Sequence, residues 1–244
     1  MTEAIKSMEA IILAGGFGLR MGSFSKDTQK CLLPIDGKPT IGHILDRLVE
    51  AFGSVDVKVG VGYKGEQVKN WVDKNKPNKV KVSYVVHKPG CEYSAYMTMD
   101  GHIHGPFIGA AGDIIVSASL YEEAAQIYER AKVDIIIAFS PYVNEVKTHA
   151  VGKIDREGRI TTYQWPPSEA LESDCLRDMN IYASCGQSFF EILREYPALG
   201  QGQELAFKHA LTDGRPLFGF SHKMRWIHLA NAVDLQKSAR EIGI

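Results

Sequence analysis

The first part of the chain contains short runs of apolar residues or of alternating apolar and polar residues. Longer segments of mixed apolar and polar residues separate these runs. Each run is short enough for a strand, and together they span residues 9–13, 55–61, 81–86, 106–111 and 134–139. Apolar residues recur at helical spacing between the runs. The helices expected from this spacing begin at Pro39 and span 64–74, 93–101 and 120–131. Such alternation of strand and helix predicts an α/β fold with a doubly wound, mostly parallel sheet.

From Pro141 onward the pattern changes. Alternating residues flank the Glu157-Gly158 turn and predict a β-hairpin over 150–155 and 159–164. Shorter elements follow, and we expect strands at 179–183, 217–220 and 225–228 and helices at 188–195, 203–211 and 233–242. We therefore predict a single domain, residues 1–244, with a mixed, mostly parallel sheet and a small β-rich insertion in its second half.

Composition narrows the classes of protein. Apolar residues make up 45% of the chain and charged residues 23%, which are ordinary values for a globular protein. The formal net charge of −1 gives no reason to expect nucleic acid or a membrane surface as a partner. No run approaches the ~20 apolar residues of a membrane span. The cysteines are scattered without a Cys-x-x-Cys pair, which favours reduced thiols and a cytoplasmic location; they are Cys31, Cys91, Cys175 and Cys185.

The segment after the first strand carries the clearest chemical signal. It runs Ala14-Gly15-Gly16-Phe17-Gly18-Leu19-Arg20-Met21. Its glycines allow a sharp bend and a close approach to a ligand, and exposed N–H groups can line a phosphate. Arg20 and the later Lys30 add positive charge beside such an anion. This combination predicts a nucleoside triphosphate site.

Other glycine-rich sites fit less well. A dinucleotide fingerprint would place glycine where this chain has Met21, and it would need an acidic residue at the end of the second strand. That strand ends in Gly60-Val61-Gly62, with Asp56 at its other end. A Walker A loop needs Gly-Lys-Ser/Thr, which does not follow. A tight turn that binds nothing would not explain Arg20 and Lys30.

With the stretch that begins at Lys30, the segment resembles sugar-1-phosphate nucleotidyltransferases (nucleotide-sugar pyrophosphorylases). That family opens with Leu-x-Gly-Gly-x-Gly-x-Arg-Leu/Met and continues with Lys-x-Leu-x-Pro-x-x-x-Lys-Pro. The matching residues are Leu13, Gly15, Gly16, Gly18, Arg20 and Met21, then Lys30, Leu32, Pro34, Lys38 and Pro39. The resemblance implies a Rossmann-like nucleotidyltransferase fold, with residues 8–140 as the nucleotide-binding half and 141–244 as the acceptor-binding half.

Site residues follow from the same resemblance. Nucleotide contacts are expected from Leu13, Ala14, Gly15, Gly16, Gly18, Arg20, Lys30 and Ser94. Gly112-Asp113 resembles the family's Gly-Asp, whose carboxylate holds Mg²⁺ against the phosphates. Mg²⁺ prefers oxygen ligands and commonly takes one or two carboxylates together with phosphates and water. Arg20, Lys30 and Asp113 are therefore the expected catalytic residues.

The acceptor half departs from the family. Its Trp-x-Asp motif, whose Asp is a second metal ligand, stands here as Trp226-Ile227-His228, so His228 is a candidate ligand of a type that suits Mg²⁺ poorly. Either one carboxylate with the phosphates suffices, another acid substitutes, or activity is impaired. The Glu-Lys-Pro motif is replaced by Gln164-Trp165-Pro166. Acceptor contacts are expected from Glu145, Lys147, Trp165 and Asn180.

The sequence as a whole predicts a Mg²⁺-dependent nucleotidyltransferase of nucleotide-sugar biosynthesis. It would transfer a nucleotidyl group from a triphosphate to a sugar 1-phosphate or a similar phosphate ester and release pyrophosphate. A cytidylyltransferase for a non-sugar phosphate, such as a polyol or choline phosphate, is the alternative enzyme. A catalytically weakened nucleotide-binding regulatory subunit is the alternative from another class. The expected partners are the triphosphate and a phosphorylated small molecule, and self-association as a homo-oligomer stays open.

Overall fold

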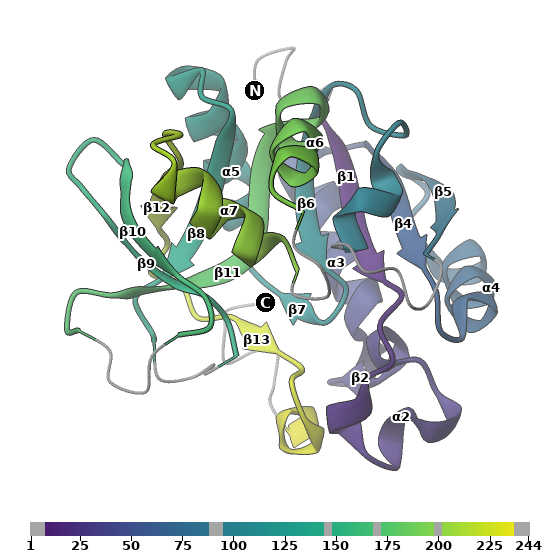
Figure 1. The fold of residues 1–244 in the computed structure, drawn as a ribbon. Helices are drawn as coiled ribbons and strands as arrows, with labels where there is room; N and C mark the ends of the chain where they lie inside the picture. Colours follow the sequence, from purple (N-terminus) through teal and green to yellow (C-terminus); the bar gives the residue numbers. More distant parts are fainter. Residues whose placement is uncertain (1–7, 88–94, 144–147, 168–171, 198–201, 237–244) are drawn as a thin grey trace.

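A nine-stranded sheet forms the centre of the protein in the computed structural model (Figure 1). The structure describes residues 8–87, 95–143, 148–167, 172–197 and 202–236. The strands are β1 Glu9–Ala14, β4 Val55–Val61, β5 Val80–Val86, β6 Pro106–Ala111, β8 Ile135–Ser140, β9 Val151–Ile154, β10 Ile160–Gln164, β11 Leu176–Cys185 and β12 Phe218–Ser221. Their positions confirm the strands expected from the apolar runs, because a buried parallel strand needs apolar residues on both faces.

The sheet is mixed, as predicted. β1 pairs in parallel with β4 and β6, β4 with β5, and β8 with β12. β11 runs antiparallel to β6, β8 and β9, and β10 runs antiparallel to β9. The β9–β10 hairpin is the β-rich insertion expected in the second half, and Figure 1 shows it projecting from one edge.

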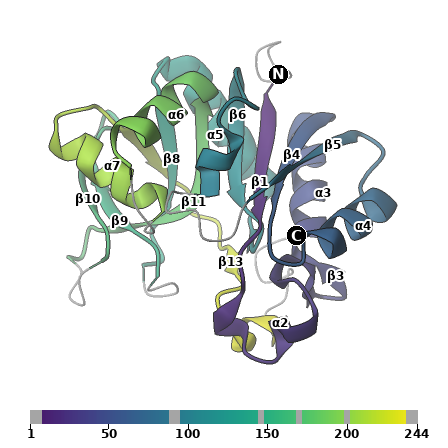
Figure 2. The ribbon, with the colours of Figure 1, turned by 45° about the vertical axis from the view of Figure 1, so that its right-hand side comes forward.

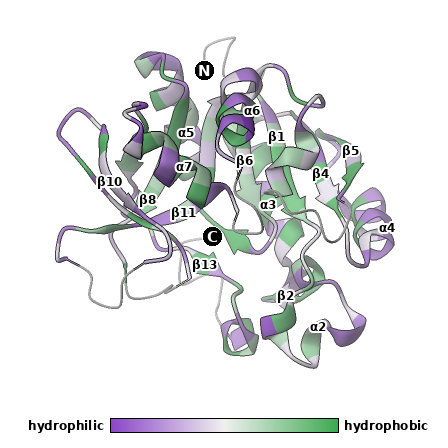
Figure 3. Ribbon diagram, in the orientation of Figure 1, coloured by the Kyte–Doolittle hydropathy of each residue, from purple (hydrophilic) through white to green (hydrophobic). Residues whose placement is uncertain are grey.

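Helices cover both faces of the sheet (Figure 2). The first face packs against α3 Thr40–Phe52, α4 Gly65–Asn75 and α5 Ala118–Ala131, and the second packs against η3 Ala95–Met99, α6 Gly186–Glu195 and α7 Gln203–Thr212. β1 serves both cores, since Ala10 and Ile12 join the first cluster and Ile11 joins the second. Figure 3 shows the same division, with hydrophobic strands inside and hydrophilic residues on the outer helix faces.

Several expected elements differ in length or type. The helix expected at 93–101 is a 3-10 helix over its described part, Ala95–Met99, and the strand expected at 225–228 is only β13 Ile227–His228. The helix expected at 233–242 opens as a 3-10 turn, Ala232–Gln236, and its remainder lies outside the described residues. β11 is longer than the expected 179–183. None of the short elements between β1 and α3, nor the two-residue β7, was predicted; these are η1 Leu19–Met21, α2 Phe24–Asp27, η2 Lys30–Leu32, β2 Pro34–Ile35, β3 Lys38–Pro39 and β7 Ile114–Ile115.

Among the described residues, no helix has the length and apolar character needed to cross a membrane.

Candidate active site

The glycine segment after β1 forms a short loop that local contacts hold open. Gly18 has φ +67°, and a Cβ added there would lie 3.2 Å from Cβ of both Ser25 and Lys30. Ser25 Oγ donates to the Gly18 carbonyl at 2.9 Å, and the Tyr63 N–H donates to the Gly15 carbonyl at 3.1 Å. Gly16 is exposed, and a Cβ there would meet nothing within 4 Å. The loop therefore presents open backbone at its tip, and a side chain at Gly18 would be strained and would press against Ser25 and Lys30.

A buried glutamine ties this loop to the segment that carries Lys30. Gln29 is 2% exposed, and its Nε2 donates to the carbonyls of Ala14 at 2.9 Å and Gly16 at 3.1 Å. Its Oε1 accepts from the Cys31 N–H at 2.5 Å. Sequence reasoning missed Gln29, because a lone polar residue next to a motif has no periodicity to mark it as buried.

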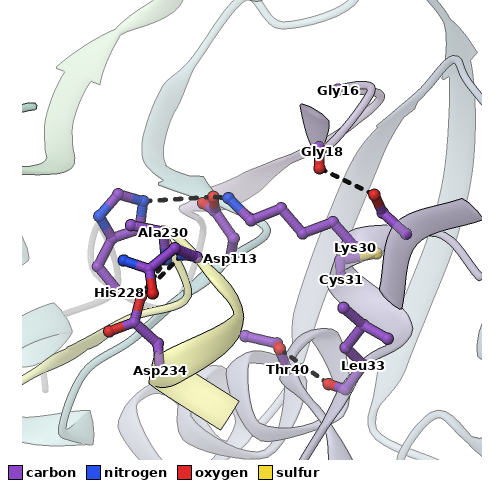
Figure 4. Close-up of polar contacts among 12 residues, drawn as sticks. Gly16, Gly18, Lys30, Cys31, Leu33, Thr40, Asp113, His228, Ala230 and Asp234 are labelled. Carbon is purple, nitrogen blue, oxygen red and sulfur yellow. Dashed lines mark hydrogen bonds and ion pairs between the residues drawn. The ribbon is translucent and has the colours of Figure 1, made fainter. Parts of the chain in front are cut away.

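Asp113 lies at the neighbouring strand end. β1 and β6 are adjacent and parallel, so their carboxyl ends meet, and the Gly112 N–H donates to the Leu13 carbonyl at 2.8 Å. A Cβ on Gly112 would lie 2.7 Å from that carbonyl oxygen, so only glycine allows this approach. Lys30 Nζ reaches Asp113 Oδ2 at 2.5 Å (Figure 4). The structure thus brings together two of the three expected catalytic residues.

His228 approaches the same carboxylate from the other side. The β7–β13 pair aligns His228 with Ile114, and the Leu229 N–H donates to the Asp113 carbonyl at 2.9 Å. His228 Nε2 lies 3.4 Å from Asp113 Oδ2. Figure 4 shows the imidazole and the Lys30 ammonium on opposite sides of the carboxylate. Asp113 and His228 are far apart in the sequence, and the short β7–β13 pair makes them neighbours.

The electrostatics of Asp113 favour its charged form. Burial opposes ionisation, but Lys30 and His228 outweigh burial and hold the pKa of Asp113 well below its usual range. Arg20 is exposed, and it makes no hydrogen bond or ion pair with any residue that the structure describes. A carboxylate that stays ionised can bind a cation, and an unpaired guanidinium is available to an anionic ligand.

These residues surround a cavity of about 470 Å³. Its wall combines the glycine loop, the basic residues and the strand ends: Leu13, Ala14, Gly16, Phe17, Gly18, Leu19, Arg20, Gln29, Lys30, Cys31, Gly112 and Asp113. A second cavity of about 260 Å³ lies across the glycine loop and is lined by Leu13, Gly15, Gly16, Phe17, Gly60, His87, Ala95 and Thr98. His87 Nδ1 is buried without a hydrogen-bond partner in the described part of the chain. Sequence reasoning gave no signal for His87.

Residues 10–144, which include the glycine loop, Lys30 and Asp113, match the model of the MobA-like NTP transferase domain. The chain belongs to that family. The sequence-based resemblance to sugar-1-phosphate nucleotidyltransferases is thereby confirmed.

Individual relatives of this MobA-like domain carry related names. UTP–glucose-1-phosphate uridylyltransferase AglF of Haloferax volcanii is 32% identical over 66% of this chain and 66% of its own length. The bifunctional protein GlmU of Methanococcus maripaludis is 31% identical over 93% of this chain and 53% of its own length. The chain thus spans between about half and two thirds of these curated relatives.

A solved structure of a UDP-glucose pyrophosphorylase complexed with UDP-glucose superposes on this chain with a TM-score of 0.80. The match covers 93% of this chain and 95% of that structure, at 19% sequence identity. A likeness at that identity shows the fold, and the fold does not by itself determine the activity.

The second half of the chain, beyond the residues that match the family model, holds a buried polar network. Asn180 has φ +53° and lies in an irregular stretch of β11; its Oδ1 accepts from Tyr182 Oη at 2.7 Å, and its Nδ2 faces His149. Asp178 Oδ2 accepts from Tyr163 Oη at 2.5 Å. Burial raises the pKa of Asp178 to about 6 although three donors oppose the shift, and burial with the nearby Asp178 charge raises the pKa of Glu204 to about 8.

The other expected site residues have different outcomes. Trp165 is half-buried against the second core cluster, and its carbonyl accepts from Lys208 Nζ at 3.1 Å. Asp234, an acid that follows His228 in the sequence, accepts with its Oδ2 from the N–H groups of Ala230 and Asn231, both at 2.8 Å. Ser94, Glu145 and Lys147 lie outside the described residues.

Proposed function

We propose that the protein transfers a nucleotidyl group from a nucleoside triphosphate to a sugar 1-phosphate or a similar phosphate ester, with release of pyrophosphate. The observation that carries this proposal is the contact of Lys30 with Asp113 beside a cavity that also presents Arg20 and the glycine loop. Cations, backbone N–H groups and one ionised carboxylate are the groups that phosphoryl chemistry needs at one place. The family and the names of the relatives support the same activity.

The chain's own residues would act by positioning and by charge. The glycine loop would let the triphosphate approach the backbone closely, and Arg20 would bind its outer phosphates and stabilise charge in the transition state. Lys30 would neutralise the α-phosphate. The acceptor phosphate is already an anion and needs no protein nucleophile, so alignment of the two reactants would supply much of the rate enhancement.

Family members generally use a divalent metal, and we propose Mg²⁺ for this protein, held by Asp113. Bound there, the ion would stabilise negative charge on the reacting phosphates. The described residues include no group of three His, Cys, Asp or Glu side chains that could hold a metal on their own. One or two protein ligands completed by phosphate oxygens and water is the arrangement that Mg²⁺ commonly adopts, so the residues fit this ion.

The two remaining subsites follow from the cavities and the polar network. We place the nucleobase in the 260 Å³ cavity, which His87 lines together with Gly15, Gly16 and Thr98. We place the acceptor beside Asn180 and His149, where polar side chains gather in the second half. A cytoplasmic location and a single catalytic domain over residues 1–244 belong to the same proposal.

Release of pyrophosphate from a panel of triphosphates and phosphorylated acceptors tests this proposal. Sugar 1-phosphates, polyol phosphates and phosphocholine should all be included, because the alternative cytidylyltransferase would respond to the last two. Turnover with one pair is expected, and Asp113→Asn should reduce kcat by about a hundredfold or more, since an ionised group at the reaction centre is lost.

Asp56→Asn is the matched control. Asp56 lies near the start of β4, at the opposite end of the sheet, and is exposed, so this variant should keep wild-type turnover. Binding of triphosphate without turnover for any acceptor would contradict the proposal and favour the regulatory subunit. Equal losses in both variants would mean that Asp113 has no special role.

A further inference from the structure

Asp113 and His228 offer two chemically different donors at one place. Asp113 presents carboxylate oxygens and His228 presents imidazole Nε2, 3.4 Å from Oδ2 (Figure 4). Two adjacent ligands of one octahedral ion with bonds near 2.1 Å lie about 3 Å apart, so the two donors would need to approach by only a few tenths of an ångström to bind the same ion.

The imidazole is held in place before any ligand binds. His228 is 4% exposed and stacks parallel to Trp226, with ring centroids 6.3 Å apart and 5° between the planes. The ring of His149 packs against it at 4.6 Å. His228 Nδ1 has no hydrogen-bond partner among the described residues. Packing therefore fixes the direction of Nε2, which is what a preorganised metal ligand requires.

We propose that Asp113 and His228 bind one divalent cation together, and that this oxygen–nitrogen pair makes the site prefer Mn²⁺ to Mg²⁺. This inference rests on the proposed function, because the phosphates of the bound triphosphate and water would supply the other ligands. Mg²⁺ would also bind there, with the lower affinity of the two ions.

Donor chemistry supports this preference. Mg²⁺ takes oxygen ligands and demands near-ideal octahedral geometry. Imidazole is a ligand of transition metals, and Mn²⁺ also accepts the carboxylate and phosphate oxygens that this site offers. An aspartate at position 228 would make both protein donors oxygen atoms.

In the structure, the ammonium of Lys30 neutralises the charge of the Asp113 carboxylate. Its ammonium contacts the Asp113 oxygen that faces His228, with Nζ 2.5 Å from Oδ2. A cation bound by Asp113 and His228 would take over that role. Lys30 would then be free to turn toward the phosphate that arrives with the ion, so one carboxylate would have two successive cationic partners.

Electron spin-echo spectroscopy of bound Mn²⁺ tests the proposal without reference to turnover. The probe is Mn²⁺ added to the full chain with inorganic tripolyphosphate, which needs no knowledge of the base. The bound ion should show ¹⁴N modulation from a directly coordinated imidazole. The modulation should vanish in uniformly ¹⁵N-labelled protein, which needs no substitution and so carries no risk of misfolding.

Two variants test which side chain supplies the coordinating nitrogen and whether that side chain determines the preference for Mn²⁺. His228→Asp should abolish the modulation and lower the ratio of Mn²⁺ to Mg²⁺ affinity on the order of tenfold, measured by competition. His222→Gln changes another buried histidine, one that contacts Glu123 and Ser117, and should leave both readouts unchanged.

Bound Mn²⁺ without ¹⁴N modulation would overturn the proposal, and so would failure of Mn²⁺ to bind with or without tripolyphosphate. The proposed function fails independently of these results. Turnover without nitrogen coordination would support the nucleotidyltransferase activity and refute the metal preference. Nitrogen coordination without turnover would support the shared cation site and refute the nucleotidyltransferase activity.

Discussion

Gln29 shows how a single side chain supports the glycine loop that follows β1. Its amide joins two carbonyls of the glycine segment to the turn that carries Lys30. Buried carbonyls that lose their donor remain desolvated and unpaired. The shape of the loop and the position of Lys30 are therefore coupled through one glutamine.

Gln29→Met should test that coupling. The substitution keeps the length of the side chain and leaves the carbonyls of Ala14 and Gly16 without their donor, so the free energy of unfolding should fall by about 1–3 kcal/mol. The affinity for triphosphate should fall as well, because the loop loses its anchor. Urea denaturation and calorimetric titration measure the two effects. Gln126→Met, an exposed change in α5, should alter neither.

At the residue scale, the sequence identifies the charged residues of the candidate site but not the residues that hold them in position. Lys30 and Asp113 belong to motifs whose residue types follow from phosphate chemistry, and the structure brings them into contact. Gln29 and His87 are polar residues whose importance depends on burial, which a single sequence does not reveal. Asn180 was predicted at the acceptor side, and its contacts are with other side chains of the polar network.

At the scale of elements, the turn after β1 is the most constrained part of the site. Gly18→Ala would place a non-glycine residue at φ +67°, which costs roughly 1–2 kcal/mol, and would push its Cβ against Lys30 and Ser25. Because Lys30 must then move, kcat/KM should fall roughly tenfold or more. Steady-state kinetics and thermal unfolding of the variant measure the two effects separately.

Gly101→Ala provides the control for backbone strain. Gly101 has φ +79°, and a Cβ there would meet nothing within 4 Å. A comparable loss of stability with unchanged kinetics is expected. If Gly101→Ala impaired kcat/KM as much as Gly18→Ala, contact with Lys30 would not be the cause.

Long elements were predictable and short ones were not. β1 and β6 are buried on both faces and therefore appear as apolar runs, β4 begins with alternating residues, and α3 has a clear helical repeat. β7 and β13 contain two residues each, which is too few for any period. Their pairing depends on tertiary contacts, and it is this pairing that places His228 beside Asp113.

At the scale of the whole molecule, the buried acids of the second half make stability depend on pH. The pKa of Glu204 is raised to about 8, so the folded state holds its proton more tightly than the unfolded state. The unfolding free energy should therefore fall as pH rises from 6.5 to 8, by about 2 kcal/mol. Below 6.5, His149 has the opposite effect, because burial lowers its pKa to about 3 and the unfolded state binds the extra proton.

Glu204→Gln should remove this slope. Urea denaturation at several pH values between 6.5 and 8.5 measures it as the difference between wild type and variant. Glu191→Gln, an exposed change in α6, should keep the wild-type slope. The same decline in both variants would assign the pH dependence to another group.

The β7–β13 pair also sets the time at which the centre is completed during synthesis. A nascent chain whose emerged portion ends after α7 already contains the glycine loop, Lys30 and Asp113, but the imidazole has not yet left the ribosome. Asp113 then has only Lys30 as its cationic neighbour. β13 follows all the other described strands in the sequence, so a partly translated chain would hold the glycine loop, Lys30 and Asp113 without the imidazole.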